Sequence, residues 1–331
     1  MITIAEIGQA HEGSLGIAHS YIDALSKTGV NVVKFQTHIA HAESSINESF
    51  RVNFSYEDLT RYDYWKRMEF TPEQWASLKK HCEDVGLEFV SSPFSMEAVD
   101  LLESLGVKRF KIGSGEVENL LMLEHIAKTG KDIWLSSGMS SEIEIQKTID
   151  FLTPHKNHIS LFQCTTEYPT QANSWGLNVI SDWKNSFNLP IGFSDHSGDI
   201  YACLSAAVVG AEFLEFHVVF DKQMFGPDAK ASLDLKQTGQ LILGLEQIQI
   251  ALENPVDKNK TDKHQTNKIL FGKSLAARCD IQKGSHIIMD YLESKKPGNC
   301  GIAARDYKSI IGKKAIKDIP KGAFLTSEDF I

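Results

Sequence analysis

Two stretches of the sequence indicate the fold: PIGFSDHSG at Pro190–Gly198 and AEFLEFHVVFDKQMFGPD at Ala211–Asp228. In each stretch an apolar run typical of a β-strand ends close to a histidine, His196 in the first and His217 in the second. Parallel barrels bury the apolar residues of their strands and carry functional side chains at the carboxyl ends of those strands. The two stretches therefore predict neighbouring strands of a barrel enzyme.

The same type of run recurs along the chain. Most runs are followed by amphipathic stretches long enough for helices, and two of these begin with capping boxes, at Thr71 (TPEQ) and Ser141 (SEIE). An open, doubly wound sheet would show the same alternation, but eight units within about 250 residues favour a closed (β/α)8 TIM barrel. The predicted strands are Ile2–Gly8, Val32–Thr37, Glu88–Ser92, Phe110–Gly113, Ile133–Ser137, Ile159–Thr165, Ile191–Asp195 and Phe213–Val219.

Composition excludes several classes of partner. The chain has 331 residues, 42% of them hydrophobic, and a net charge of −9 without a basic stripe, so neither nucleic acid nor a membrane surface is expected as a partner. The longest uncharged run, Ile200–Ala211, is too short to span a bilayer, and a strand at Ile2 leaves no room for a signal peptide. Five scattered cysteines without a C-x-x-C pair are expected to be reduced, which indicates a cytoplasmic protein.

A change of composition marks the end of the predicted barrel. The polar stretch that begins at Glu253 predicts a linker, so we expect a barrel over residues 1–252, a linker over 253–271 and a tail over 272–331. The tail repeats a short phrase, DIQKG at Asp280–Gly284 and DIPKG at Asp318–Gly322, which suggests a compact β-rich module. So small a unit has a thin core, and we expect it to dock on another surface.

The histidines are candidates for a metal site. If the strands ending near His196 and His217 are adjacent, the two imidazoles can share one divalent ion, with Glu12 from the first strand within reach. Two histidines that are only hydrogen-bonded in the barrel rim would give the same pattern, and the residues alone leave both readings open.

A phosphate site is also predicted at the barrel mouth. The turns KIGSGE at Lys111–Glu116 and SSGMS at Ser136–Ser140 lead from strands into helices, where backbone N–H groups favour an anion. The carboxylates of Glu12, Glu116 and Asp228 are available for proton transfer or for binding hydroxyl groups, although solvated loop acids would look the same. Other polar residues near the strand ends include Glu6, Lys34, Ser92, Ser194 and Glu215.

Together these phrases resemble the sialic acid synthase family. The motifs IAEIGQAHEG, VVKFQTH, EFVSSPFS, KIGSGE, LSSGM, CTTEYPT, GFSDHS, GAEFLEFHVVFDK and GPDAKASLD occur in the family's order over Ile2–Asp234, and the tail resembles the antifreeze-like (SAF) domain. The resemblance implies a synthase that condenses phosphoenolpyruvate with N-acetylmannosamine or a related N-acylated amino sugar, giving a sialic-acid-type nonulosonic acid and phosphate. It also implies a divalent metal, with Mn²⁺ favoured and Mg²⁺, Co²⁺ or Zn²⁺ as alternatives, and a homodimer with exchanged C-terminal domains.

The resemblance also assigns roles to individual residues. It implies that His196 and His217 hold the metal and that Lys296 faces the sugar bound in the partner's barrel. This chain departs from the family in carrying Lys296-Pro297-Gly298 where many members have Arg-Pro-Gly, and Ala229 where many have histidine. Phosphoenolpyruvate is assigned to Lys34, Lys111, Ser114, Ser136 and Ser194, and the sugar or the chemistry to Glu12, Gln36, Glu116, Tyr168 and Asp228.

Two other functions are compatible with the residues alone. A metal-dependent sugar-phosphate isomerase or hydrolase on the same barrel would keep both the histidines and the phosphate turns. The protein would be a non-catalytic carbohydrate-binding protein if the tail were the functional part. The fold by itself does not distinguish these functions.

Overall fold

The computed structural model describes residues 1–50 and 54–331, which divide into two compact units, Met1–Asn254 and Pro255–Ile331. Each unit is described by itself.

The first unit is a (β/α)8 barrel, which confirms the predicted fold. Its sheet has the strand order β3-β2-β1-β8-β7-β6-β5-β4 with parallel neighbours, and the end strands β3 and β4 lie side by side. The predicted strand boundaries are right to within two residues; β8 ends at His217 because Val218 instead forms an isolated bridge with Leu233. The strands are β1 Ile2–Gly8, β2 Val32–Thr37, β3 Glu88–Pro93, β4 Arg109–Ile112, β5 Asp132–Ser136, β6 Ile159–Cys164, β7 Ile191–Asp195 and β8 Phe213–His217.

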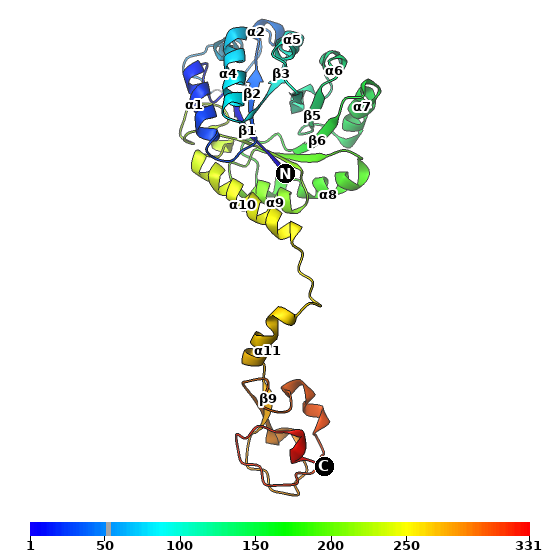
Figure 1. Ribbon diagram of the computed structural model, residues 1–331. Helices are drawn as coiled ribbons and strands as arrows, with labels where there is room; N and C mark the ends of the chain where they lie inside the picture. The colour runs from blue at the N-terminus through cyan, green and yellow to red at the C-terminus, as the bar shows by residue number, and fades with distance from the viewer. Residues whose placement is uncertain (51–53) are drawn as a thin grey trace. The chain divides into compact units, whose positions relative to one another are not determined.

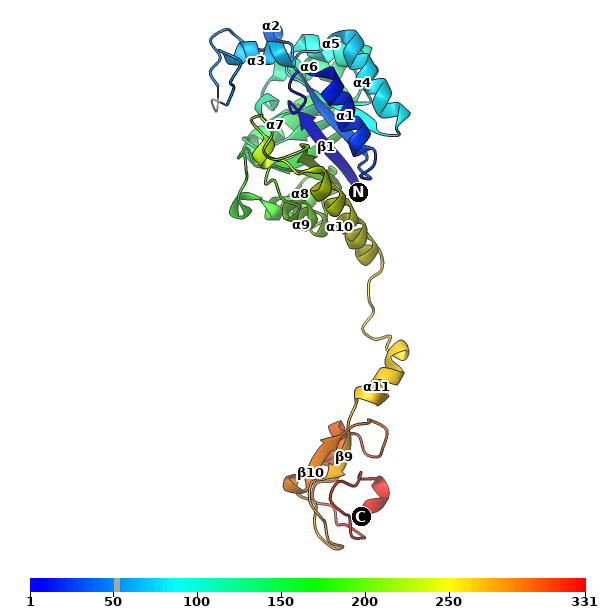
Figure 2. The same ribbon diagram turned by 90° about the vertical axis from the view of Figure 1, so that its left-hand side faces the viewer.

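Helices surround the strands on the outside of the barrel (Figures 1 and 2). Both predicted capping boxes are present: Thr71 accepts a hydrogen bond from the backbone N–H of Gln74, and Ser141 accepts one from that of Glu144. The helices are α1 Leu15–Leu25, α2 Ala40–Glu43, α3 Arg61–Met68, α4 Pro72–Asp84, α5 Met96–Ser104, α6 Leu120–Lys128, α7 Glu142–Leu152, α8 Leu177–Ser186, α9 Tyr201–Val208 and α10 Leu235–Glu253.

The barrel interior is layered because alternate residues of a strand face the same side. A buried apolar cluster contains Ile4, Val32, Val90, Trp134 and Phe162. Two residues further along their strands, these positions are followed by polar or reactive side chains. They are Glu6, Lys34, Ser92, Ser136 and Cys164, all of them buried. The two-residue period of the strands therefore places a layer of polar side chains next to the apolar cluster, on the side of the carboxyl ends of the strands.

The second unit contains the antiparallel pair β9 Ser274–Ala277 and β10 Leu292–Lys295 and its own small core. The two copies of the repeated phrase are joined by two reciprocal hydrogen bonds. Asp318 accepts a hydrogen bond from Lys283 N at 2.6 Å, and Asp280 accepts one from Lys321 N at 2.7 Å. Helix α11, Gln265–Phe271, lies in the segment predicted as linker and ends at Gly272, whose N–H donates to Lys268 O.

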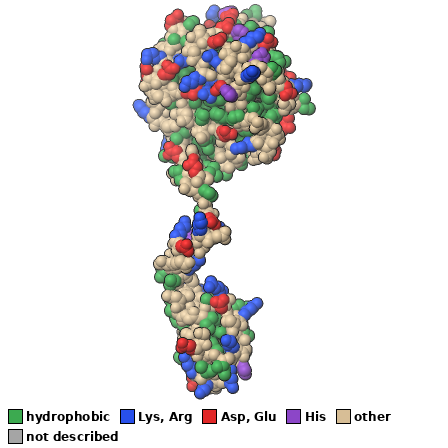
Figure 3. All heavy atoms as spheres, turned by 45° about the vertical axis from the view of Figure 1, so that its right-hand side comes forward, with side chains coloured by type: hydrophobic (Ala, Val, Ile, Leu, Met, Phe, Trp, Pro, Cys, Tyr) green, Lys and Arg blue, Asp and Glu red, His purple; other side chains and the backbone are tan. Residues whose placement is uncertain are grey.

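The face seen in Figure 3 carries acidic and basic side chains interspersed with apolar ones. Among the described residues, no helix combines the length and the apolar character that crossing a membrane requires.

Candidate active site

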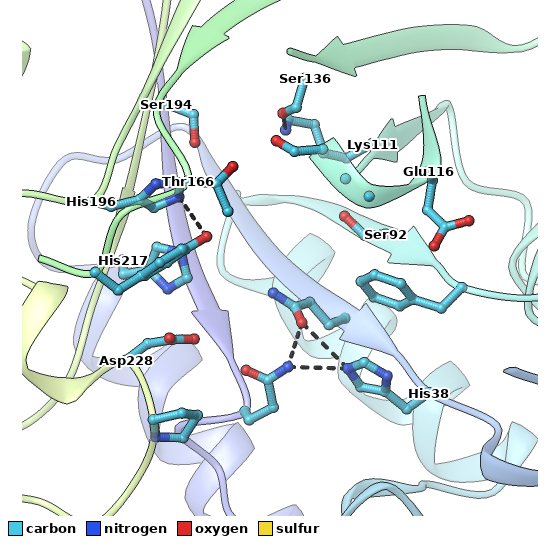
Figure 4. A pocket seen from close by; sticks show the side chains of 18 of the residues that line it. His38, Ser92, Lys111, Glu116, Ser136, Thr166, Ser194, His196, His217 and Asp228 are labelled. Atoms are coloured by element: carbon cyan, nitrogen blue, oxygen red, sulfur yellow. Dashed lines mark hydrogen bonds between the residues drawn. The ribbon is translucent and has the colours of Figure 1, made fainter. Parts of the chain in front are cut away.

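A cavity of about 390 Å³ opens at the carboxyl ends of the barrel strands. His196 and His217 lie on one side of it, and Lys111, Ser136 and Ser92 lie across from them (Figure 4). The fold thus brings together residues that are far apart in the sequence. The predicted site residues that line the cavity are Lys34, Gln36, Lys111, Ser114, Glu116, Ser136, Tyr168, Ser194, His196, His217 and Asp228.

Among the predicted site residues of the first unit, Glu12 does not line the cavity. Glu12 has a positive φ of 50° and binds Arg67, with 3.0 Å between its Oε2 and Arg67 Nη1. Burial raises the pKa of Glu12 to about 7, although Arg67 opposes the shift. Lys296 belongs to the second unit, where its Nζ lies 5.1 Å from the centre of the Phe271 ring.

The cavity floor holds two buried lysines and two buried glutamates. Lys34 forms an ion pair with Glu6, and its Nζ lies 3.7 Å from Glu215 Oε1. Lys111 Nζ lies 3.5 Å from the same Glu215 oxygen and donates to Ser136 Oγ. Buried charges persist only when they are paired, and here the two signs balance in number.

The pKa values of the two lysines are nevertheless shifted in opposite directions. Burial opposes charge on Lys34, but Glu215 and Glu6 outweigh it, so the pKa of Lys34 is raised. For Lys111 burial prevails over the attraction of Glu215, Lys34 adds repulsion, and the pKa of Lys111 is lowered. Burial therefore disfavours the charged form of Lys111, and an anion bound beside its ammonium group would favour that form.

His196 and His217 lie close together in the cavity. The ring centres of His196 and His217 are 5.3 Å apart. The Nδ1–H of His196 donates to the carbonyl oxygen of Thr165 at 2.8 Å, which leaves Nε2 as the acceptor facing the Tyr168 hydroxyl at 3.1 Å. Burial, reinforced by His217, lowers the pKa of His196 to about 3, so the imidazole is neutral at physiological pH.

A backbone hydrogen bond of this kind is the usual support of a metal-binding histidine. The described residues contain no group of three histidine, cysteine or carboxylate side chains arranged to hold an ion. An ion bound by His196 and His217 would thus keep positions open for substrate or water.

The turn after β5 packs tightly against the turn after β4. Gly138 N donates to Ser114 Oγ at 3.1 Å, and Ser114 Oγ lies 3.2 Å from Cys164 Sγ. A Cβ on residue 138 would lie 2.4 Å from Thr166 Oγ1 and 2.8 Å from both Ser114 Oγ and Cys164 Sγ. Glycine is required here by close approach.

We therefore expect Gly138→Ala to weaken anion binding by roughly 10-fold, because Ser114 must move. Calorimetric titration with inorganic phosphate measures this without relying on turnover. Gly130→Ala is not a suitable control, since Gly130 has a positive φ, whereas Gly239→Ala changes a glycine in α10 with open space around it. Unchanged phosphate affinity in Gly138→Ala would show that Ser114 is not part of the anion site.

The sequence analysis missed a cluster around His38. His38 is stacked between Trp65 and Phe94, with ring centres 4.0 and 4.6 Å away. Its Nδ1 lies 2.8 Å from Glu43 Oε1 and its Nε2 lies 3.1 Å from Gln9 Nε2. The position of His38 directly after a predicted strand was an available signal. Its partners Glu43 and Trp65 lie on the short helices α2 and α3, whose packing against the strand end the sequence does not indicate.

Fold and site together define a (β/α)8 barrel with buried lysines and a histidine pair in one cavity, as in a barrel enzyme. Residues 21–257 match the model of the NeuB family and residues 272–331 match that of the SAF domain. The chain belongs to the NeuB family.

Named relatives resemble nearly the whole chain. It is 35% identical to an N,N'-diacetyllegionaminic acid synthase of Campylobacter jejuni over 323 residues, which cover 96% of each chain. It is 30% identical to the N-acetylneuraminate-9-phosphate synthase of Homo sapiens, covering 98% of this chain and 91% of the relative. Among solved structures, an N-acetylneuraminic acid synthetase from Leptospira borgpetersenii in complex with citrate is similar at a TM-score of 0.71 and 27% identity, covering 80% of this chain and 89% of that chain.

Proposed function

We propose that the protein condenses phosphoenolpyruvate with an N-acylated amino sugar to give a sialic-acid-type nonulosonic acid and phosphate. The single observation that carries the proposal is that one cavity is lined both by buried Lys111, 3.5 Å from Glu215, and by the adjacent pair His196 and His217. One end of this cavity suits an anion, and the other end suits a polarised carbonyl group. The names of the relatives, which are synthases of three kinds of nonulosonic acid, support the same reaction.

In the proposed mechanism the cavity floor holds phosphoenolpyruvate. Lys34 and Lys111 neutralise its phosphate and carboxylate, while hydroxyl groups of Ser114, Ser136 and Ser194 donate to the remaining oxygens. The enol carbon of phosphoenolpyruvate attacks the aldehyde carbon of the open-chain sugar, forming the new C–C bond. Water adds at C2 of the resulting cation, and phosphate leaves as the C–O bond breaks.

Proton transfer in this reaction is assigned to carboxylates. Glu116 lines the cavity, and burial raises its pKa, with the charge of Glu43 adding to the shift. Glu12 has its pKa raised to about 7 and lies outside the lining, so we assign Glu116 the closer position to the reacting atoms. A raised pKa lets a carboxyl group donate as well as accept a proton near neutral pH.

A divalent ion, with Mn²⁺ favoured, is proposed at His196 and His217, whose ring centres lie 5.3 Å apart in the cavity and whose imidazoles are ligand types that suit it. Such an ion would polarise the aldehyde oxygen of the sugar. The Tyr168 hydroxyl, which lies 3.1 Å from His196 Nε2, orients this imidazole in the protein itself.

An assay of phosphate release tests the proposal against its alternatives. Release that requires both phosphoenolpyruvate and an N-acylated amino sugar is expected. Conversion of a sugar phosphate without phosphoenolpyruvate would instead identify an isomerase or hydrolase, and sugar binding without turnover would identify a binding protein.

We also propose a cytoplasmic homodimer in which each tail covers the partner's barrel. Charge supports this, because residues 1–254 carry 19 Lys and Arg against 34 Asp and Glu, whereas residues 255–331 carry 15 against 9. Opposite net charges favour association of the two kinds of unit. All five cysteines are free thiols, a state that cytoplasmic proteins usually maintain.

Truncation after Asn254, where the first unit ends, should leave a folded barrel that has lost most of its turnover. Mixing it with full-length His217→Ala should restore part of the activity, because the intact tail can cover the truncated chain's barrel. Mixed dimers are verified by mass. Normal turnover of the truncated protein alone, or no recovery in verified mixed dimers, would show that the tail has no part in the site.

A further inference from the structure

His38 is buried, and its ring is held in one position. The rings of Trp65 and Phe94 stack on it, with ring centres 4.0 and 4.6 Å away and planes tilted by only 16° and 8°. Glu43 binds one edge of the ring, since its Oε1 lies 2.8 Å from His38 Nδ1, and its Oε2 accepts from Ile39 N at 3.3 Å. Stacking and hydrogen bonding together fix the plane and the rotation of the ring.

The other edge of the His38 ring faces two side-chain amides (Figure 4, dashed lines). Gln9 Nε2 donates to Gln36 Oε1, and His38 Nε2 lies 3.1 Å from the first of these atoms and 3.3 Å from the second. If His38 Nε2 accepts, it holds Gln9 in place as the donor to Gln36. If it carries a proton, it can donate to Gln36 Oε1 directly. In both protonation states of His38 the oxygen of Gln36 is therefore held on the side of the ring.

Gln36 is thus left with its amide nitrogen to offer to a ligand. It lines the cavity, and among the described residues none accepts a hydrogen bond from its Nε2. A side-chain amide carries an acceptor oxygen and a donor nitrogen on the same carbon, so an amide that is free to turn would present either. With the oxygen held, this point of the cavity presents N–H donors. The partner that suits them is an oxygen that accepts, such as that of a hydroxyl group or an acyl carbonyl group.

We propose that His38 and Gln9 are positioning residues, which fix the side-chain amide of Gln36 so that its nitrogen donates to an oxygen of the sugar. The inference rests on the proposed function, which places an N-acylated amino sugar in this cavity. A fixed amide has no rotational freedom to lose when the sugar binds, so more of the hydrogen bond contributes to affinity. His38 and Gln9 themselves take no part in the chemistry.

His38→Phe tests the proposal, because it keeps an aromatic ring between Trp65 and Phe94 but removes both ring nitrogens. The full-length protein is assayed with N-acetylmannosamine, or with the member of an N-acylated hexosamine panel that is used best. We expect the KM for the sugar to rise about 10-fold, the effect of one lost hydrogen bond. The KM for phosphoenolpyruvate and kcat should each change by less than about threefold, because the lysines and the histidine pair are untouched. A thermal melt checks folding.

His41→Asn is the matched control. His41 is exposed, and its Nε2 lies 3.0 Å from Glu97 Oε2, so this variant also removes a histidine–carboxylate pair but does so outside the cavity lining. Its kinetics should stay those of the parent. Equal increases of both KM values in His38→Phe, or an unchanged KM for the sugar, would overturn the assignment of His38.

A double-variant cycle shows whether His38 acts through Gln36. Gln36→Ala alone should raise the KM for the sugar by about 10-fold, since it removes the donor. Once His38→Phe has released the amide, removing the amide should cost little more, so the double variant should also show an increase of about 10-fold. Independent effects would multiply to roughly 100-fold, and that result would contradict a positioning role.

Gln9→Leu tests the same arrangement without altering the aromatic stack. It removes the donor to Gln36 Oε1, so it should raise the KM for the sugar selectively and show no further loss when combined with Gln36→Ala. If the parent consumes phosphoenolpyruvate with a sugar but neither His38→Phe nor Gln9→Leu changes the KM for that sugar, the inference is wrong and the proposed condensation stands. If no N-acylated hexosamine supports consumption of phosphoenolpyruvate by the parent, the proposed function fails, and this inference with it.

Discussion

Replacement of Lys111 by alanine should raise the KM for phosphoenolpyruvate by roughly 100-fold and the KM for the sugar only slightly. Lys111 is 2% exposed, and its charge is only partly neutralised by Glu215 at 3.5 Å. A bound phosphate or carboxylate completes this neutralisation, so its affinity depends on the ammonium group. In the proposed mechanism the sugar binds on the side of His196 and His217, so its affinity does not depend on the ammonium group of Lys111.

Steady-state kinetics with each substrate varied in turn measure the two KM values. Lys108→Ala is the control, because Lys108 is exposed just before β4 and should leave both values unchanged. A thermal melt checks folding, since the variant leaves Glu215 buried with one partner fewer. If both KM values rise equally, the anion does not bind at Lys111.

Replacement of His217 by alanine should reduce turnover by about 1,000-fold or more, because one of two protein ligands of the proposed ion is lost. Chelation should abolish activity in the parent protein, and added Mn²⁺ should restore it there but not in the variant. Metal content is measured on the same samples by mass spectrometry.

His158→Ala is the matched control for this variant. His158 is exposed outside the cavity, so its removal should change neither metal content nor turnover. The metal assignment is wrong if His217→Ala turns over normally, or if the parent protein is fully active after chelation.

The barrel was predictable from sequence because strand periodicity carries most of the information. The eight runs place Glu6 and Lys34 on the inner face of their strands, and that same alternation produces the polar layer seen in the structure. Local hydrogen bonding is equally legible, as the capping boxes at Thr71 and Ser141 show. Features that depend on residues close together in the sequence can therefore be predicted without a structure.

Contacts between the carboxyl ends of strands and the long segment between β2 and α4 could not be predicted from the sequence. Glu12 was expected in the active site, but its carboxylate binds Arg67, which Asp58 also holds at 2.8 Å. Arg67 lies on α3, within the long segment between β2 and α4, and the sequence does not indicate where this helix packs. The sandwich of His38 between Trp65 and Phe94 has the same origin, since it joins a strand end to that connection.

The balance of charges in the cavity also could not be predicted from the sequence. The residues alone place Lys34 and Lys111 at strand ends, but they do not say that one glutamate, Glu215, lies within 3.7 Å of both. Burial, with repulsion from Lys34 that the shared carboxylate of Glu215 does not outweigh, lowers the pKa of Lys111. The anion site proposed at Lys111 depends on this three-dimensional arrangement.

The most direct test of the central claim is mass spectrometry of the products formed from phosphoenolpyruvate and a panel of N-acylated hexosamines. The account predicts a product whose mass is that of the sugar plus pyruvic acid, with one inorganic phosphate released for each molecule formed. A product that retains phosphorus from phosphoenolpyruvate, or sugars recovered unchanged while phosphoenolpyruvate is hydrolysed, would contradict it.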